Sequence, residues 1–227
     1  MHELDGHAMK REGSAPWLLA HLFQAYAETP DMREELTANP DVALFAPSFV
    51  AKARSLPITP PIDLFFQGAI NNNPSERNWV VEFAREHFTV DSLFCDTSDA
   101  PANDQLDDWD YTGRIECRAP FPGLGYMRGG PSTPVQDRGY WSAMRRATFA
   151  LCPAGREQWS FRTYEALMCD AIPIVIDPDH IWRTTVEQQI GFEYVLADDW
   201  PVEADPHLVL RNRQRFHQWH MLESPSR

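Results

Sequence analysis

Residues 149–177 read FALCPAGREQWSFRTYEALMCDAIPIVID. The stretch opens with an apolar run that ends at Cys152, and it closes with a second run, residues 172–176, that contains no polar residue. Unbroken apolar runs of this length are typical of strands that are buried on both faces of a parallel sheet. Residues 161–169, between the two runs, are expected to form a helix. The stretch therefore predicts a strand over residues 148–152, a loop, a helix and a second strand over residues 172–176, which is the βαβ unit of a parallel sheet.

The same alternation of elements continues on both sides of this stretch. The pattern predicts strands over residues 62–66, 90–95 and 194–196, and helices over residues 75–88, 137–147, 181–190 and 205–221. Two loops are expected, an acidic one over residues 96–110 and a Gly- and Pro-rich one over residues 118–134. The fold class predicted is therefore α/β, a Rossmann-like domain with a parallel sheet and helices on both faces.

The first 60 residues have a different character. Residues 1–15 are polar and expected to be flexible, and a short helical segment follows them. Pro57, Pro60 and Pro61 mark a boundary. We therefore expect an N-terminal segment over residues 1–60 and the Rossmann-like domain over residues 61–227. No run of 18 apolar residues predicts a transmembrane helix, and the polar N-terminus is unlike a signal peptide or a membrane anchor.

Charge and cysteine usage narrow the possible functions. The formal net charge is −13, so a polyanion such as DNA or RNA would be repelled, and nucleic-acid binding is not expected. Only two of the twenty basic residues are lysines, and arginine is suited to bidentate contacts with phosphate or carboxylate. The four cysteines do not form CxxC pairs, so no zinc site is expected, and Cys95 and Cys152 are predicted to be buried thiols.

The candidate ligand site lies between the two strands of the opening stretch. In an open parallel sheet, ligands bind at the carboxyl ends of the strands, which places residues 153–160 at the crevice. Ser160 is expected to cap the helix, whose first N–H groups and dipole form an anion site, and Arg162 would add a charged fork for a diphosphate. Glu165, one turn further, could accept two hydrogen bonds from a ribose diol, and Asp177 follows the second strand as a possible crevice contact. The alternative is that Ser160 only caps the helix while Arg162 and Glu165 form a solvated surface pair.

These residues resemble the exostosin-like family of glycosyltransferases, of the family 47 type. Its pattern is a strand ending in Cys-Pro, a glycine loop, Ser-x-Arg-x-aromatic-Glu-Ala-Leu and a strand Ile-Pro-Val-Ile. The pattern is found here as Cys152-Pro153, Gly155, Ser160-x-Arg162-x-Tyr164-Glu165-Ala166-Leu167 and Ile172-Pro173-Ile174-Val175. The ribitol xylosyltransferases are similar over the same stretch. Upstream, Leu64 to Gly68 followed by Arg77 is similar to the first strand of the family and its basic loop. Asp170 stands where the family usually has glycine.

The resemblance implies a GT-B glycosyltransferase that needs neither metal nor another cofactor. Such an enzyme moves a sugar from a nucleoside diphosphate sugar to a hydroxyl of a glycan or glycoprotein acceptor. Its C-terminal domain would bind the donor, with Arg162, Ser160 and Gly155 near the diphosphate, Arg77 as a second phosphate contact and Glu165 on the ribose. A GT-B enzyme also needs a second Rossmann-like domain for the acceptor, for which residues 1–60 are too short. The general base is not assigned.

Two other functions remain open at this point. The chain could be a catalytically silent module that keeps the nucleotide-sugar fold without turnover. It could also be a metal-dependent GT-A transferase, because Asp108 and Asp110 fit the Asp-x-Asp pattern that binds a divalent metal there. The compartment follows from the length of the natural protein: cytoplasmic if this chain is complete, and the Golgi lumen if it is a fragment of a membrane-anchored transferase.

Overall fold

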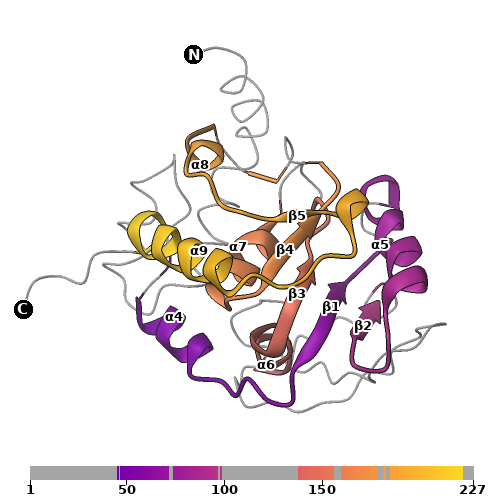
Figure 1. Ribbon diagram of the computed structural model, residues 1–227, viewed down its shortest axis with the longest axis horizontal. Coiled ribbons are helices and arrows are strands. Elements are labelled where there is room, and N and C mark those ends of the chain that lie inside the picture. The colour runs from indigo at the N-terminus through magenta and orange to yellow at the C-terminus, as the bar shows by residue number, and fades with distance from the viewer. Residues whose placement is uncertain are drawn as a thin grey trace, which may run out of the picture.

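The computed structural model of the chain describes residues 45, 47–71, 74–96, 98, 138–155, 160–177, 181–182 and 185–221. These residues form a five-stranded parallel sheet with helices on both faces, which confirms the α/β, Rossmann-like fold class (Figure 1). No helix among them is long and apolar enough to cross a membrane.

The order of the strands defines where a ligand would bind. The strands are β1 (Ile62–Gly68), β2 (Leu93–Asp96), β3 (Ala147–Leu151), β4 (Ile172–Val175) and β5 (Val195–Leu196). They lie in the order β2-β1-β3-β4-β5. The chain therefore runs outward from β1 to β2, returns to β3 beside β1, and then runs outward in the other direction to β4 and β5. The point of reversal between β1 and β3 is the topological switch point, where open α/β sheets bind their ligands.

Two apolar cores separate the sheet from its helices. The described helices are α4 (Pro47–Arg54), α5 (Pro74–His87), α6 (Arg138–Arg146), α7 (Phe161–Met168), α8 (Thr185–Gln189) and α9 (Pro206–Trp219), with a short 3-10 helix, η3 (Ala197–Asp199). One core lies on the face covered by α4, α6, α7 and α9, and the other lies under α5. Neighbouring residues of one strand point into different cores, as Phe65 and Phe66 do in β1. In Figure 1, α5 lies beside β1 and β2, while α4 and α9 lie on the opposite side of the picture.

Two predicted elements begin later than the sequence suggested. The strand expected from residue 90 begins at Leu93, because Thr89 to Ser92 form a turn in which the Ser92 N–H donates to the Thr89 carbonyl at 3.1 Å. The helix expected over residues 181–190 is described as helical only over 185–189. Trp182 lies before it and packs against Tyr164 and Phe192, with ring centroids 5.8 and 5.3 Å away. The apolar pattern that predicted a longer helix therefore includes Trp182, which contacts the core although it lies before the helix begins.

The segment before β1 adds a helix that the sequence did not predict. Val50 and Ala53 of α4 are 1% and 0% exposed and belong to the core that also contains Tyr164 and Phe216. Phe45 forms a parallel bridge with Met221 near the other end of the chain. The thiols of Cys95 and Cys152 are buried, as predicted. Most of the two predicted loops, and Cys117, lie outside the described residues.

Candidate functional site

The amino terminus of α7 is capped as the sequence predicted. The backbone of Ser160 is extended, with φ −139° and ψ 140°, and its Oγ accepts a hydrogen bond from the Arg162 N–H at 3.2 Å. The preceding strand, β3, ends at Leu151, and the chain then passes Cys152 to Gly155 before it reaches the cap. A capped helix that begins beyond the carboxyl end of a central strand directs its positive dipole end toward the crevice.

Arg162 does not lie on the surface. Its guanidinium group lies over the Phe66 ring, 5.0 Å from the centroid, and its Nη2 donates to the Gln67 carbonyl near the end of β1. Among the described residues, the buried Nε and Nη1 atoms make no hydrogen bond of normal geometry, although the guanidinium group lies close enough to the Tyr140 hydroxyl to lower its pKa. Buried donors of this kind are rare in folded proteins, and an absent ion or ligand is one of the usual reasons. The guanidinium group is therefore positioned at the switch point, and two of its nitrogen atoms lie outside any normal hydrogen bond among the described residues.

Gly68 makes this position of Arg162 possible. A Cβ atom at residue 68 would lie 2.6 Å from Nη2 of Arg162 and 3.1 Å from Nη1. Real Cβ atoms do not approach other atoms so closely, so a side chain at residue 68 would displace the guanidinium group. The glycine that ends β1 thus leaves room for the close approach of an arginine from α7, and the two residues form one feature of the switch point.

Arg77 joins the two segments on either side of the switch point. Its Nε donates to the Ala154 carbonyl at 2.9 Å, and its Nη1 donates to the Ala69 carbonyl at 2.6 Å. Ala69 follows β1 and Ala154 lies in the segment after β3, immediately before the half-buried Gly155. Burial, together with the nearby charge of Arg162, lowers the pKa of Arg77 to about 10, so its side chain is still protonated at neutral pH. The sequence predicted that Arg77 contacts phosphate. In the structure, its Nε and Nη1 atoms instead hold the backbone at the crevice.

Glu165 lies inside the protein, and Tyr140 is its partner. The carboxylate is 3% exposed and accepts a short hydrogen bond from the Tyr140 hydroxyl of α6. Burial and the charge of Glu165 raise the pKa of Tyr140 well above its usual value, while Arg162 acts in the opposite direction. The alternative of a solvated Arg162–Glu165 surface pair is therefore wrong. The sequence offered no signal for Tyr140 except its position on a predicted helix.

Asp177 lines a small pocket beside these residues, together with a carboxylate that the sequence did not predict. The pocket lies where β3 and β4 end and the first turn of α5 begins. Its lining consists of Glu76, Cys152, Pro153, Ala154, Val175, Ile176, Asp177 and Ile181. Glu76 carries no motif of its own, but it directly precedes Arg77, whose similarity to the basic loop of the family could have drawn attention to it.

The metal-binding alternative rests on residues that the structure does not describe. Asp108 and Asp110 do not belong to the described residues. Within the part of the chain that the structure describes, no three His, Cys, Asp or Glu side chains are grouped so that they could hold a metal ion. The positive charge at the switch point comes from Arg77, Arg162 and the end of α7.

The comparisons with known proteins agree with this arrangement. No curated protein and no solved structure matches the chain. A family model does match it: the Exostosin GT47 domain covers residues 18–201, which is more than half of the sequence and includes every site residue named above. The chain therefore belongs to the Exostosin GT47 domain family, and is a glycosyltransferase by family.

Proposed function

We propose that the switch-point site binds the diphosphate of a nucleoside diphosphate sugar, and that the chain carries the donor-binding half of a GT-B transferase. The observation that carries the proposal is the Arg162 guanidinium group at the switch point, two of whose nitrogen atoms, Nε and Nη1, make no hydrogen bond of normal geometry among the described residues. They lie beside the capped end of α7, and a helix amino terminus is itself favourable for an anion. A hydroxyl group of a glycan or glycoprotein would be the acceptor of the sugar.

The proposed chemistry is electrostatic. When the sugar leaves the donor, negative charge grows on the departing nucleoside diphosphate. Arg162 and the N–H groups of α7 would offset that charge from fixed positions, which is an effective form of transition-state stabilisation. Because the protein itself would supply this positive charge, we propose that the reaction does not depend on a metal. Arg77 would contribute its charge while it holds the segment around Ala154 in place.

The experiment that tests the diphosphate site compares two ligands. Arg162→Ala should weaken binding of nucleoside diphosphates by about ten- to a hundredfold, because a charge-assisted hydrogen bond contributes about 1.5–3 kcal/mol. Binding of the bare nucleosides should change far less. The measurement is isothermal titration with UDP, GDP and ADP and with uridine, guanosine and adenosine. Arg85→Ala, an exposed arginine on α5, is the matched control. Equal affinity of wild type and Arg162→Ala for each diphosphate would remove the support for this site.

The same titrations test the metal-dependent alternative. Nucleoside diphosphate binding should persist in EDTA, because Arg162 and the end of α7 would supply the positive charge. Loss of binding in EDTA that manganese restores would favour the GT-A mechanism and Asp108 and Asp110. The silent-module alternative predicts binding of the donor without transfer, so an assay for sugar release in the presence of acceptors separates it from an active transferase.

A further inference from the structure

Tyr140 of α6 lies beside the residues of the proposed diphosphate site. It is 6% exposed, and its ring meets the Phe65 ring of β1 edge-on, with centroids 5.9 Å apart. The ring of Trp141 packs against it from the same helix, with centroids 5.2 Å apart. Its hydroxyl donates to the Glu165 carboxylate of α7. Packing therefore fixes the ring of Tyr140, and a charge-assisted hydrogen bond fixes its hydroxyl group.

The same hydroxyl group also lies beside Arg162. Arg162 precedes Glu165 by three residues, so the two side chains lie on one face of α7. Both affect the Tyr140 hydroxyl, because burial and Glu165 raise its pKa, whereas the charge of Arg162 and the closeness of its donors act to lower that pKa. A phenolic oxygen can donate one hydrogen bond and still accept another. The hydroxyl therefore stands between the guanidinium group and the carboxylate, and it donates its proton to Glu165.

We propose that Tyr140 is a positioning residue for Arg162, and that its hydroxyl holds the guanidinium group where it would contact the donor diphosphate. The inference rests on the proposed function, because that function gives Arg162 its ligand. Two other contacts leave one motion open. Cζ of Arg162 lies 5.0 Å from the centroid of the Phe66 ring, and Nη2 donates to the Gln67 carbonyl, so the group could still turn about Nη2 over the ring. A third contact, at the Tyr140 hydroxyl, removes that rotation.

The intervening hydroxyl also keeps Arg162 available for a ligand. A direct ion pair with Glu165 would occupy the guanidinium donors, and an arriving phosphate would have to displace a carboxylate. The hydroxyl oxygen carries no net charge, so it attracts the guanidinium group less strongly than a carboxylate or a phosphate does. An arginine that is already fixed in its bound position also loses less side-chain freedom when the ligand arrives, which raises affinity.

Cys152 does not take over the role of a counter-charge for Arg162. Burial raises the pKa of its thiol to about 12, although the charge of Arg162 acts in the opposite direction, so the thiol is neutral at pH 7. Its Sγ donates to the Ala150 carbonyl at 3.3 Å. The negative charge that acts on Tyr140 and Arg162 from α7 is therefore that of Glu165, and the Tyr140 hydroxyl is what separates it from the guanidinium group.

The test compares two buried tyrosines that each donate to a buried carboxylate. Tyr140→Phe removes the hydroxyl beside Arg162, whereas the matched control Tyr164→Phe removes the one that donates to Glu187 at 2.5 Å. Isothermal titration measures binding of UDP, GDP and ADP and of uridine, guanosine and adenosine. We expect Tyr140→Phe to weaken diphosphate binding about three- to tenfold and to leave nucleoside binding unchanged. Tyr164→Phe should bind every ligand as wild type does.

Thermal transitions show whether each variant is folded. Tyr140→Phe takes a donor away from the buried Glu165 carboxylate, which can destabilise the protein. If this variant does not fold, Glu165→Gln is compared with the double variant Glu165→Gln, Tyr140→Phe, because residue 165 is then uncharged in both. The two differ by the hydroxyl alone, so we again expect a loss of about three- to tenfold for the diphosphates. Equal affinities would overturn the inference.

A second double variant separates positioning from a general structural effect. If Tyr140 acts through Arg162, Tyr140→Phe should cost no further diphosphate affinity in the Arg162→Ala background, because coupled residues are not additive. A loss of equal size in both backgrounds, an equal loss for the nucleosides, or an equal loss in Tyr164→Phe would overturn the inference. If Arg162→Ala weakens binding but Tyr140→Phe does not, the inference fails and the proposed function stands. Failure of the wild type to bind any of these diphosphates removes both.

Discussion

At the scale of single residues, Gly68 and Arg162 can be tested as one feature. Gly68→Ala places a Cβ atom 2.6 Å from Nη2 of Arg162, which is the end of a flexible side chain and can move away. We therefore expect a modest loss of stability, about 1 kcal/mol, as is common for single substitutions. The free energy of binding nucleoside diphosphates should change by more than this loss of stability. The change should approach the one expected for Arg162→Ala.

The measurement is the same titration with UDP, GDP and ADP, together with urea unfolding. The double variant Gly68→Ala, Arg162→Ala is the critical control. If Gly68 acts only by positioning Arg162, the double variant should bind no more weakly than Arg162→Ala alone, because coupled residues are not additive. Fully additive losses would show that Gly68 affects binding by another route.

Asp170 shows how one residue can depart from the pattern of its family. It follows α7 with φ +65°, a conformation that glycine adopts without strain and that aspartate tolerates better than most residues. Its side chain, 5% exposed, accepts from Nε and Nη2 of Arg213 at 2.9 and 2.6 Å, and Arg145 and Arg54 lie within 3.2 and 3.7 Å. The usual glycine is therefore replaced by a carboxylate that joins α4, α6 and α9 to the end of α7.

At the scale of elements, apolar patterns and caps were the reliable signals. The strands expected at residues 148–152 and 172–176 are observed at 147–151 and 172–175, because a strand buried on both faces requires an unbroken apolar run. Ser160 marked the start of α7 because the cap is a local hydrogen bond within three residues. Signals that depend only on neighbours along the chain can be recognised in one sequence.

Features that depend on distant contacts could not be predicted in this way. Helix α4 is short, and isolated helices of its length are unstable, so its existence depends on packing against the core. Tyr140 bonds to Glu165 only because α6 brings the two side chains together. Glu76 lines the pocket only because α5 begins beside the end of β4. The sequence predicted a diphosphate contact for Arg162 and a ribose contact for Glu165, and both stay predictions. The structure adds the residues that surround them, and it shows Glu165 buried with its carboxylate on the Tyr140 hydroxyl.

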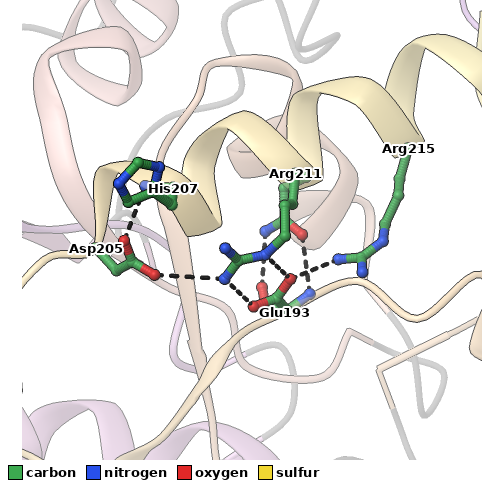
Figure 2. A network of polar contacts seen from close by, with 6 residues as sticks. Glu193, Asp205, His207, Arg211 and Arg215 are labelled. Carbon is green, nitrogen blue, oxygen red and sulfur yellow. Dashed lines mark hydrogen bonds and ion pairs between the residues drawn. The ribbon is translucent and has the colours of Figure 1, made fainter.

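An ion-pair network connects Glu193 with α9, and it predicts a dependence of stability on pH (Figure 2). The Glu193 carboxylate accepts from Nε and Nη2 of Arg211, both at 2.6 Å, and from Nη1 of Arg215 at 2.7 Å. Mainly because of the Arg211 hydrogen bonds, the pKa of Glu193 falls from 4.5 to about 2. A carboxylate with a lowered pKa in the folded state stabilises the protein above pH 4.5, and this stabilisation is lost as the pH falls through 2.

Glu193→Gln should therefore reduce the free energy of unfolding at pH 7 by about 1 kcal/mol, a small value because the network is partly exposed and screened by water. The difference from wild type should shrink as the pH falls from 4.5 toward 2. Urea unfolding at a series of pH values measures it, with Glu203→Gln, at an exposed residue, as the control. A difference that stays constant from neutral pH down to the lowered pKa would contradict the assignment of that pKa to this network.

At the scale of the whole molecule, the described residues before β1 share the core of the Rossmann-like fold. Phe45 is fully buried, and its ring lies 5.5 Å from that of Phe216 on α9 and 6.4 Å from that of Tyr164 on α7. Its N–H also donates to the His220 carbonyl at 2.8 Å. Tyr164 in turn directly precedes Glu165, so this contact connects residue 45 with the helix that carries the candidate site.

We therefore expect Phe45→Ala to lower the free energy of unfolding of the whole unit by about 3–5 kcal/mol, the usual cost of removing a buried phenylalanine ring. Ile58→Ala, at a position that is 57% exposed in the same segment, should change it by less than about 0.5 kcal/mol. Urea unfolding followed by both tryptophan fluorescence and circular dichroism measures the change. If the segment before residue 60 were instead an independent unit, Phe45→Ala would leave the main transition in place and only a separate, smaller transition would move. Coincident shifts of both signals would show that Phe45 and α4 unfold together with the sheet, because Phe45, Val50, Ala53 and Leu56 are buried in the core that covers it.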